Sequence, residues 1–413
     1  MGLLLYNLII RSYNLFVLVF SFINIRARNL IKGRKRAFKT ISDKKQDNKR
    51  IIWFHCASLG EFEQGLPVME SIKLTYPEYL IYISFFSPSG YEIQKNHKVA
   101  DCVFYLPADT GSNADKLLGL LDPIAVFFIK YEFWFYYLRA CSDRNIPVFS
   151  ISTILRPDQL FFKFYGGFYR KILTLFAHFF VQNMETKELL NGLGLTNVTI
   201  SGDTRFDRVN AISKEQPSID IIENFKMNHN LVVLGSAWKQ DIDLWNSYIS
   251  ENDNLKFIIA PHHINEENLK YIEKKIRSNI LRYSKSSNDF GNNSVLIIDN
   301  IGMLSAIYRY ADITYVGGAF GEGLHNILEP ATFGKPIIIG KAASNKKYHE
   351  VTALIKEGGA FEISNSSELR TIMNNLLSDS ALRQHVGKSC RDFVNANLGS
   401  TDKIMEEINP ILS

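Results

Sequence analysis

Residues 313–331 read ITYVGGAFGEGLHNILEPA, and this stretch decides the fold. Ile313 to Val316 predict a short buried strand that runs directly into a segment with four glycines. Glycine lets a backbone approach an anion closely, and a helix that begins near Asn326 would offer free N–H groups and a positive dipole end. Glu329 would then lie on the first helical turn, where it could accept hydrogen bonds from sugar hydroxyls. The same spacing fits a capping box, in which Asn326 caps the helix and Glu329 folds back onto it.

Strands and helices are predicted to alternate along the rest of the chain. Apolar strands are separated by amphipathic stretches such as Gly65–Tyr76, and a polar stretch, Asn210–Asn230, divides them into two series. The expected strands are Ile51–His55, Leu80–Phe85, Ile124–Ile129, Val148–Ile151 and His178–Val181 in the first series, and Leu231–Leu234, Lys256–Ala260, Val295–Ile298, Ile313–Val316 and Ile337–Ile339 in the second. Such strands predict an α/β protein with two doubly wound domains, in which ligands bind beyond the carboxyl ends of parallel strands.

Composition narrows the class of protein. The chain has 413 residues, enough for two domains, and 46% of them are hydrophobic, enough for a full core. Its four cysteines lie far apart with no CxxC pair, which argues against a disulfide framework or a zinc site. The net charge of +5 is concentrated in residues 26–50, which hold eleven Lys or Arg against two Asp. A general nucleic-acid surface is therefore not expected.

Residues 1–25 read MGLLLYNLIIRSYNLFVLVFSFINI and predict a membrane anchor. The stretch is long enough to span a bilayer, which takes about 20 apolar residues, but Arg11 would then lie inside the membrane. A helix in the membrane interface would accommodate Asn7, Arg11 and Asn14 better. A signal peptide is disfavoured because the positive charges follow the apolar segment. With either anchor, residues 26–50 would face anionic lipid headgroups; the alternative is a solvated, disordered linker.

In the first domain, polar side chains follow the predicted strands. Ser58, Gly60 and Glu61 form a turn that leads into a helix, and Glu61 is a candidate general base there. A glutamate at this position would also be favourable for the helix dipole alone. Glu132 follows the third strand among aromatic residues, and a buried carboxylate without a partner is costly. We therefore expect Glu132 to be exposed, functional, or paired with the neighbouring Lys130 or with Arg139.

Near the boundary between the two series, Arg205 could take the charge of a phosphate or carboxylate. In the second domain, Ser236 follows a strand and could contact a phosphate through its backbone and hydroxyl. Adjacent His262 and His263 suggest a metal, but no acidic or cysteine partner stands at ligand spacing. The Asp241-Ile242-Asp243 triple is discounted as a metal site because acids are favoured on a first helical turn.

These motifs, in this order, resemble the Kdo transferase family, whose members add 3-deoxy-D-manno-octulosonic acid (Kdo) to lipid A precursors. The family's Trp-Phe-His…Ser-x-Gly-Glu signature matches WFHCASLGE at residues 53–61. Its Gly-Gly-His-Asn-Pro-Leu-Glu-Pro-Ala signature matches EGLHNILEPA at residues 322–331. The matching stretches run from residue 52 to about residue 349. The predicted N-terminal anchor also agrees with the family pattern.

The resemblance implies a GT-B glycosyltransferase fold, with two Rossmann-like doubly wound domains facing a cleft and an N-terminal membrane-anchoring helix. The expected parts are an anchor helix at residues 1–25, a basic juxtamembrane segment at 26–50, an acceptor-binding domain at 51–210, a linker at 211–230, a nucleotide-sugar-binding domain at 231–390 and a C-terminal helix at 391–413 that crosses back to the first domain. The family's location implies the cytoplasmic face of the bacterial inner membrane.

The resemblance also implies a donor, an acceptor and residue roles. CMP-Kdo would be the donor and lipid IVA the acceptor, with inversion at the anomeric carbon and no metal or other cofactor. Glu61 would remove the proton of the acceptor hydroxyl, and Glu132 and Arg205 would support the transition state. The positions expected to bind substrate are Ser58, Gly60, Ser236, Pro261, His262, Ile301, Gly302, Met303, Asn326, Ile327, Leu328 and Glu329.

The chain departs from the family pattern at two of these positions. His262 stands where the family has an arginine, so a permanent cation is replaced by a titratable ring. Arg205 stands where the family has a lysine, which keeps the charge but changes the geometry. Alternatives are a nucleotide-sugar 2-epimerase, another membrane glycosyltransferase, or a membrane-bound protein that binds a nucleotide sugar without consuming it. A Rossmann dehydrogenase is disfavoured because no GxGxxG follows the first strand.

Overall fold

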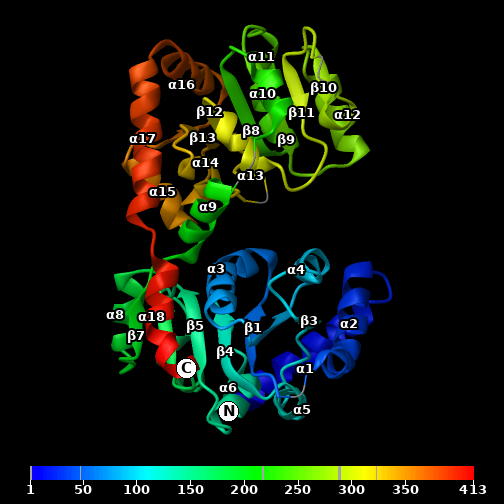
Figure 1. Cartoon of the computed structure of the whole chain (residues 1–413), viewed down its shortest axis with the longest axis vertical. Helices are drawn as coiled ribbons and strands as arrows, with labels where there is room; N and C mark the ends of the chain where they lie inside the picture. The colour runs from blue at the N-terminus through cyan, green and yellow to red at the C-terminus, as the bar shows by residue number, and fades with distance from the viewer. Residues whose placement is uncertain (1, 47, 216–217, 287–289, 322) are drawn as a thin grey trace. The chain divides into compact units, whose positions relative to one another are not determined.

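The computed structural model describes residues 2–46, 48–215, 218–286, 290–321 and 323–413. The chain forms two compact units. Unit 1 contains residues 1–208 and 398–413, and unit 2 contains residues 209–397. Each unit holds one seven-stranded sheet (Figure 1).

The sheet of unit 1 has the strand order β3-β2-β1-β4-β5-β6-β7, and all neighbouring strands are parallel. Its strands are β1 (Ile51–Cys56), β2 (Leu80–Phe85), β3 (Cys102–Tyr105), β4 (Pro123–Ile129), β5 (Val148–Thr153), β6 (His178–Val181) and β7 (Val198–Ile200). Successive residues of β1 enter opposite cores, with Trp53 in one and Phe54 in the other. This explains the continuous apolar sequence of the strands. The strand order reverses between β1 and β4, so ligands are expected at their carboxyl ends.

Helices cover both faces of this sheet. They are α3 (Leu59–Thr75), α4 (Pro88–Gln94), α5 (Gly111–Leu121), α6 (Phe135–Ser142), α7 (Gly167–Leu173) and α8 (Met184–Asn191), with a 3₁₀ turn η1 at Leu160–Phe162. The last helix of the chain, α18 (Ser400–Leu412), returns to this unit and packs into the core that also holds Phe62 of α3. Asp207 accepts the backbone N–H groups of Gly399 at 2.8 Å and Thr401 at 2.7 Å, which fixes the start of α18.

The sheet of unit 2 has the order β10-β11-β9-β8-β12-β13-β14 and is also parallel throughout. Its strands are β8 (Leu231–Ala237), β9 (Lys256–Pro261), β10 (Ile280–Arg282), β11 (Val295–Ile297), β12 (Ile313–Val316), β13 (Ile337–Gly340) and β14 (Ala360–Ile363). Its helices are α10 (Asp220–Lys226), α11 (Lys239–Ser250), α12 (Glu266–Lys275), α13 (Leu304–Ile307), α14 (Leu328–Thr332), α15 (His349–Lys356), α16 (Ser366–Ser378) and α17 (Ser380–Ala396), with 3₁₀ turns at Tyr283–Lys285, Tyr308–Tyr310 and Ala343–Lys347. Here the order reverses between β8 and β12, which places the crevice beside the glycine-rich stretch that follows β12.

The first two helices, α1 (Gly2–Phe20) and α2 (Ile25–Lys44), both belong to unit 1. The basic segment is therefore helical up to Lys44, with a cap from Asn24, and this part is not a disordered linker. By length and composition α1 is the one helix among the described residues that could cross a membrane. Asn7 of α1 accepts the Tyr136 hydroxyl at 2.8 Å, and Asn14 accepts Nη1 of Arg34 at 3.1 Å, so these two polar side chains face the protein, whereas Arg11 and Ser12 are exposed.

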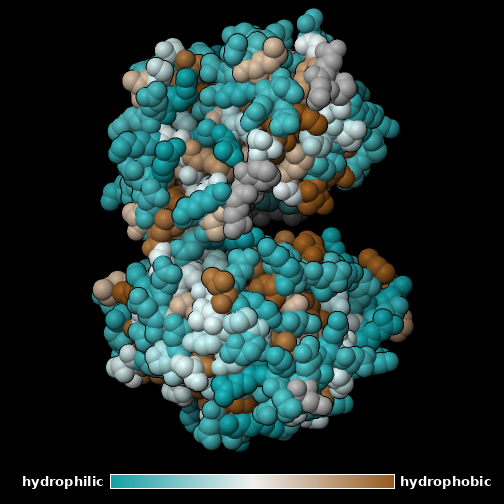
Figure 2. Space-filling view, in the orientation of Figure 1, coloured by the Kyte–Doolittle hydropathy of each residue, from teal (hydrophilic) through white to brown (hydrophobic). Residues whose placement is uncertain are grey.

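The outward face of α1 and of the turn after it is mainly apolar, with Arg11 and Ser12 as exposed polar residues of the helix. Its exposed side chains include Leu4, Leu5, Leu8, Ile9, Leu15, Phe16, Leu18, Val19, Phe22 and Ile23. Figure 2 shows hydrophobic atoms at the outer edge of unit 1 beside α2, on a surface that is otherwise mainly hydrophilic.

The structure corrects several sequence expectations. Four short strands were not expected: β3, β7, β10 and β14, each of three or four residues. The expected linker at 211–230 contains the end of α9 (Thr204–Glu215) and α10, and the units divide at residues 208/209. The expected single helix at 391–413 is two helices, because Gly399 adopts a left-handed conformation (φ 91°) that interrupts the helical path between α17 and α18.

Candidate active site

Glu61 lies on the first turn of α3, immediately beyond the carboxyl end of β1. Ser58 caps this helix, and its Oγ accepts the Glu61 N–H at 3.5 Å. The Glu61 carboxylate turns back and accepts the N–H of Ala57 through Oε2. The other carboxylate oxygen of Glu61, Oε1, has no hydrogen-bond partner in the described part of the chain. Burial, and then the charge of Glu132, raise the pKa of Glu61 to about 7, against the lowering effect of the Ala57 N–H.

Glu132 follows β4, the strand beside β1, and its carboxylate belongs to a buried polar cluster. Its Oε2 lies 3.1 Å from Nε2 of the fully buried His55 and 2.5 Å from Nε1 of Trp134. Trp134 Nε1 also lies 3.2 Å from His55 Nε2, but one N–H cannot point at both atoms, and the shorter contact is the one to the carboxylate. Glu132 therefore has His55 and Trp134 as partners, and Arg139, one of the two expected cations, instead lies 3.6 Å from Asp143.

The proton on His55 Nε2 follows from the carboxylate that it faces. Ser84 Oγ accepts the Trp53 indole N–H at 2.8 Å and lies 2.8 Å from His55 Nδ1. The Ser84 hydroxyl can also donate to the Phe54 carbonyl at 3.4 Å, so Ser84 alone does not fix the proton on the ring; a carboxylate accepts, and Nε2, which faces Glu132, therefore carries a proton. His55 then donates to Glu132, and two N–H groups converge on one carboxylate oxygen. Trp53, Ser84 and His55 thus form a buried relay that fixes the position of Glu132.

Arg205 lies on the first turn of α9 and is held by Asp203. Its Nε and Nη2 lie 2.9 and 2.7 Å from Asp203 Oδ2, and this pairing lowers the pKa of the buried Asp203. Asp203 also accepts Gln64 Nε2 of α3 at 3.0 Å, one turn after Glu61. The charges of Arg205 and Glu61 both act on Tyr131, which follows β4. The three predicted catalytic residues are therefore gathered in unit 1.

In unit 2, the crevice between β8 and β12 is closed by Asp241. Its carboxylate accepts the Tyr315 hydroxyl at 2.5 Å, the Trp238 N–H at 2.8 Å and the Gly318 N–H at 3.1 Å. A Cβ on Gly317 would lie 2.6 Å from Asp241 Oδ2, and Gly318 has φ 101°, so both positions require glycine. Asp241 thus holds the glycine-rich loop, residues 317–327, against the loop after β8. Glu322 of this loop lies outside the described residues.

Three rings from three loops meet at this edge of the sheet. Trp238 stacks on His262 with centroids 4.4 Å apart and an interplanar angle of 14°, and His262 lies 4.6 Å from His325. Trp238 Nε1 donates to His325 Nε2 at 3.3 Å. Burial, and then His262, lower the pKa of His325 to about 4, so His325 is neutral at neutral pH. This aromatic stack offers a flat face and polar edges to a ligand.

The end of the glycine-rich loop differs from both sequence interpretations. The helix α14 begins at Leu328 and has five residues. Asn326 Oδ1 accepts the Leu328 N–H at 3.1 Å, and Asn326 Nδ2 donates to Glu329 Oε1 at 3.3 Å. Glu329 is on the first turn as expected, but its side chain meets the Asn326 amide instead of closing a capping box. Because α14 is so short, a ligand here would be held mainly by side chains and loop amides.

The remaining predicted positions lie in three places. Those beside the crevice of unit 2 are Ser236 in β8, which has φ 51°, Pro261 at the end of β9, Ile327, which is buried, and Leu328, also buried. The turn before α13 carries Ile301, which is 92% exposed, Gly302 with φ 98°, and Met303, whose Sδ lies 2.8 Å from Asn300 Nδ2. In unit 1, Gly60 is exposed on the first turn of α3.

Asp241 and Asp243 do not form a joint metal site. Asp241 is fully buried and used by the glycine-rich loop, whereas Asp243 bonds Lys275 at 2.6 Å and Tyr271 at 2.6 Å. Across the residues that the structure describes, no group of three or more His, Cys, Asp or Glu is arranged to hold a metal ion.

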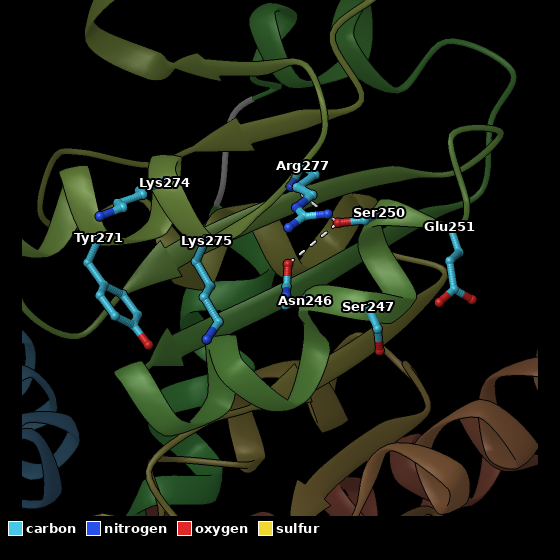
Figure 3. A pocket seen from close by; sticks show the side chains of 8 residues that line it. All are labelled: Asn246, Ser247, Ser250, Glu251, Tyr271, Lys274, Lys275 and Arg277. Carbon is cyan, nitrogen blue, oxygen red and sulfur yellow. Dashed lines mark hydrogen bonds between the residues drawn. The ribbon is translucent and has the colours of Figure 1, made fainter.

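A separate groove, of about 780 Å³, lies elsewhere in unit 2 (Figure 3). Its lining comes from the ends of α11 and α12, including Ser250, Lys274 and Arg277. Helices in such sheets run antiparallel to the strands, so these carboxyl ends of helices lie at the opposite edge from the crevice. We therefore exclude this groove from the candidate active site.

Comparisons with known proteins bear on the fold and on the family of the chain. The chain is similar to the UDP-GlcNAc 2-epimerase from Neisseria meningitidis bound to UDP-GlcNAc, with a TM-score of 0.61, 16% identity, and coverage of 87% of this chain and 98% of that one. This likeness concerns the fold, and with the two parallel seven-stranded sheets it places the chain in the GT-B class.

Sequence relatives identify the family. Residues 32–208 match the family model described as 3-Deoxy-D-manno-octulosonic-acid transferase (kdotransferase). The 3-deoxy-D-manno-octulosonic acid transferase of Aquifex aeolicus (strain VF5) is 30% identical over 341 residues, which cover 80% of this chain and 87% of the relative. The transferase of the same description from Rickettsia bellii (strain RML369-C) is 26% identical, with 96% and 95% coverage. The chain belongs to the 3-deoxy-D-manno-octulosonic acid transferase family and is therefore a glycosyltransferase.

Proposed function

We propose that this enzyme transfers Kdo from CMP-Kdo to lipid IVA, a lipid A precursor, with inversion at the anomeric carbon. The observation that carries the proposal is the state of Glu61. Its carboxylate is largely buried, is held at one oxygen by the Ala57 N–H, and has a pKa raised to about 7. A carboxylate with such a pKa can take a proton from a sugar hydroxyl at neutral pH.

The other residues have roles that follow from their positions. Glu132, fixed by His55 and Trp134, keeps a second negative charge near Glu61 and supports the electron-poor anomeric carbon. Arg205, oriented by Asp203, supplies positive charge on the same side. The phosphate of the leaving CMP would be held by amides of the glycine-rich loop and by Ser236, and the cytosine by the stack of Trp238, His262 and His325. No metal is needed in this scheme.

The two N-terminal helices support a position at the cytoplasmic face of the inner membrane. The exposed face of α1 is mainly apolar and carries Arg11, while Tyr6, Ile10 and Val17 pack on unit 1 along most of the helix. A helix bound to the protein in this way fits the membrane interface better than an independent span. The basic face of α2 would then meet anionic headgroups.

The test is mass spectrometry of lipid IVA after incubation with the enzyme and CMP-Kdo in the presence of EDTA. We expect the mass of lipid IVA to increase by one or more Kdo residues. A donor-only incubation tests the epimerase alternative, since that reaction would convert a nucleotide sugar without acceptor. Unchanged lipid IVA together with bound but intact CMP-Kdo would favour a non-catalytic binding protein and overturn the proposal.

His55→Phe is expected to lower kcat about 10- to 100-fold while leaving the KM for CMP-Kdo unchanged. The change removes the Nε2 donor from Glu132, a loss of roughly 1–3 kcal/mol, and also the ring partner of Ser84, whose hydroxyl keeps the Phe54 carbonyl as an acceptor. Steady-state kinetics and thermal unfolding measure both effects. His178→Phe is the matched control, because His178 bonds Thr199 at 2.9 Å in the same sheet. Equal kinetic losses in the two variants would mean that His55 is only structural.

A further inference from the structure

A short loop of unit 1, residues 160–166, presents aromatic side chains to solvent, and we call it the aromatic loop. Phe164 is 93% exposed and Tyr165 is 62% exposed, and their rings meet edge to face with centroids 5.0 Å apart. Leu160, at the start of the loop, is exposed as well. Large apolar side chains that gather on a surface in this way are a mark of an interaction site.

The backbone of the aromatic loop is held in shape by Arg170 of α7. The guanidinium donates to three carbonyl oxygens of the loop, which are those of Phe161 at 3.2 Å, Lys163 at 2.7 Å and Phe164 at 3.4 Å. A Cβ on Gly166 would lie 1.9 Å from the carbonyl oxygen of Leu160, so the close approach of the two ends of the loop requires glycine. The exposed rings are therefore presented by a loop whose backbone is fixed.

The aromatic loop lies beside the amino-terminal end of α1. Phe168, on the first turn of α7 directly after the loop, has its ring centroid 5.7 Å from that of Tyr6. A Cβ on Gly2 would lie 2.4 Å from the Cβ of Phe168. The exposed apolar residues at this end of α1 are Leu4, Leu5 and Leu8. The loop therefore stands next to the part of α1 whose outward face is apolar.

The aromatic loop is also tied to the predicted catalytic edge of the sheet. It follows β5, which is parallel to β4 and β1, so the carboxyl ends of the three strands lie at one edge. Phe161, the buried residue of the loop, contacts the ring of Phe133 edge to face at 4.9 Å, and Phe133 follows Glu132 directly in the sequence. The loop therefore connects the apolar end of α1 to the strand end that carries Glu132.

The chemistry of the aromatic loop suits the boundary between lipid headgroups and acyl chains. Tyrosine is enriched at membrane–water interfaces, and Phe and Leu form the inserted faces of interfacial helices. Lys163 precedes Phe164, and the exposed Lys171 follows on α7, so cations accompany the rings as anionic headgroups require. A bilayer is favoured over a protein partner because the loop adjoins α1, the helix that the proposed function assigns to the membrane.

We propose that the aromatic loop inserts Phe164 and Tyr165 into the bilayer surface as a second attachment beside α1. This inference rests on the proposed function. A single helix lying in the membrane interface leaves unit 1 free to rotate about the helix axis, and a second contact beside it fixes that rotation. Because the loop packs on Phe133, its insertion holds the strand end that carries Glu132 near the lipid headgroups. The sugar of a membrane-bound glycolipid acceptor lies at that level.

The test attaches an environment-sensitive fluorophore to one new cysteine of the full chain. The four native cysteines are buried, so Phe164→Cys can be labelled selectively. With vesicles of phosphatidylethanolamine and phosphatidylglycerol that contain no acceptor, we expect the emission to shift to shorter wavelength and to be quenched by nitroxide-labelled lipid. The matched control is Leu74→Cys, because Leu74 is 85% exposed on the last turn of α3 in the same unit. Its emission should not change.

Two results of the fluorescence experiment would overturn the inference. One is an unchanged emission at residue 164, whether or not the protein sediments with the vesicles. The other is a shift that appears only when lipid IVA is added to the vesicles, because the loop would then bind the acyl chains of the acceptor and not the bilayer. Labelled Tyr165→Cys provides an independent probe of the same loop and should respond as Phe164→Cys does.

Kinetics with vesicle-embedded lipid IVA test the consequence for transfer. Phe164→Ser should raise the KM for this acceptor about tenfold, the size expected when one aromatic ring no longer leaves water, and should leave the KM for CMP-Kdo unchanged. Leu74→Ser should change neither value. An unchanged KM for the acceptor in Phe164→Ser would contradict the inference. The fluorescence experiment requires no transfer, so if lipid IVA receives no Kdo the proposed function fails, and the emission at residue 164 still decides whether the loop enters the bilayer.

Discussion

Replacing Glu61 with Gln should lower the rate of Kdo transfer about 10²- to 10⁴-fold, the range expected for the loss of a general base. The amide keeps the size of the side chain and can still accept the Ala57 N–H, but it cannot take a proton from the acceptor hydroxyl. The pKa of Glu61 is raised to about 7 by burial and by Glu132, which makes this carboxylate both basic enough and ionised enough to act near neutral pH.

The Glu61 variant has a close control on the same helix. Glu63 lies two residues further on and pairs with Arg208 at 2.8 Å, so Glu63→Gln should transfer Kdo at nearly the wild-type rate. Binding of CMP-Kdo to Glu61→Gln, measured by calorimetry, should be unchanged, because the nucleotide is assigned to unit 2. If the folded Glu61→Gln enzyme retains more than about a tenth of wild-type transfer, the base must be another group.

Glu132→Gln should have the second largest effect, a loss of about 10²-fold in kcat. The variant keeps an oxygen that can accept from His55 and Trp134, so the change is one of charge more than of shape. Because the charge of Glu132 raises the pKa of Glu61, its removal should lower that pKa. The acid limb of the pH–rate profile should therefore move to lower pH, while the remaining rate is reduced. An acid limb that stays in place would show that the two carboxylates do not interact.

The central strands could be predicted from the sequence because burial on both faces makes them continuously apolar. Leu80–Phe85, His178–Val181 and Ile313–Val316 have the predicted bounds. Edge strands such as Cys102–Tyr105 and Ile280–Arg282 were missed, since three or four residues at the side of a sheet leave no such pattern. The GT-B class followed from two strand–helix series together with the family motifs.

Residues of the candidate site could be predicted only where a charged side chain stands shortly after a strand in the sequence. Glu61 and Glu132 were found because β1 and β4 end just before them. The partner of Glu132 was not, because His55 stands 77 residues away and is brought beside it by the pairing of β1 with β4. The same holds for the stack of Trp238, His262 and His325, which joins three separate loops. Asp203 lies two residues from Arg205, but only the turn before α9 shows that the two side chains are paired.

The measurement that tests the account most directly is the pH dependence of kcat/KM for lipid IVA in the wild-type enzyme. Since Glu61 must lose its proton to act as a base, and its pKa is raised to about 7, kcat/KM should rise with pH and level off above neutrality. A profile that is already flat from about pH 5, where an ordinary glutamate is ionised, would contradict the assignment of Glu61 as the base.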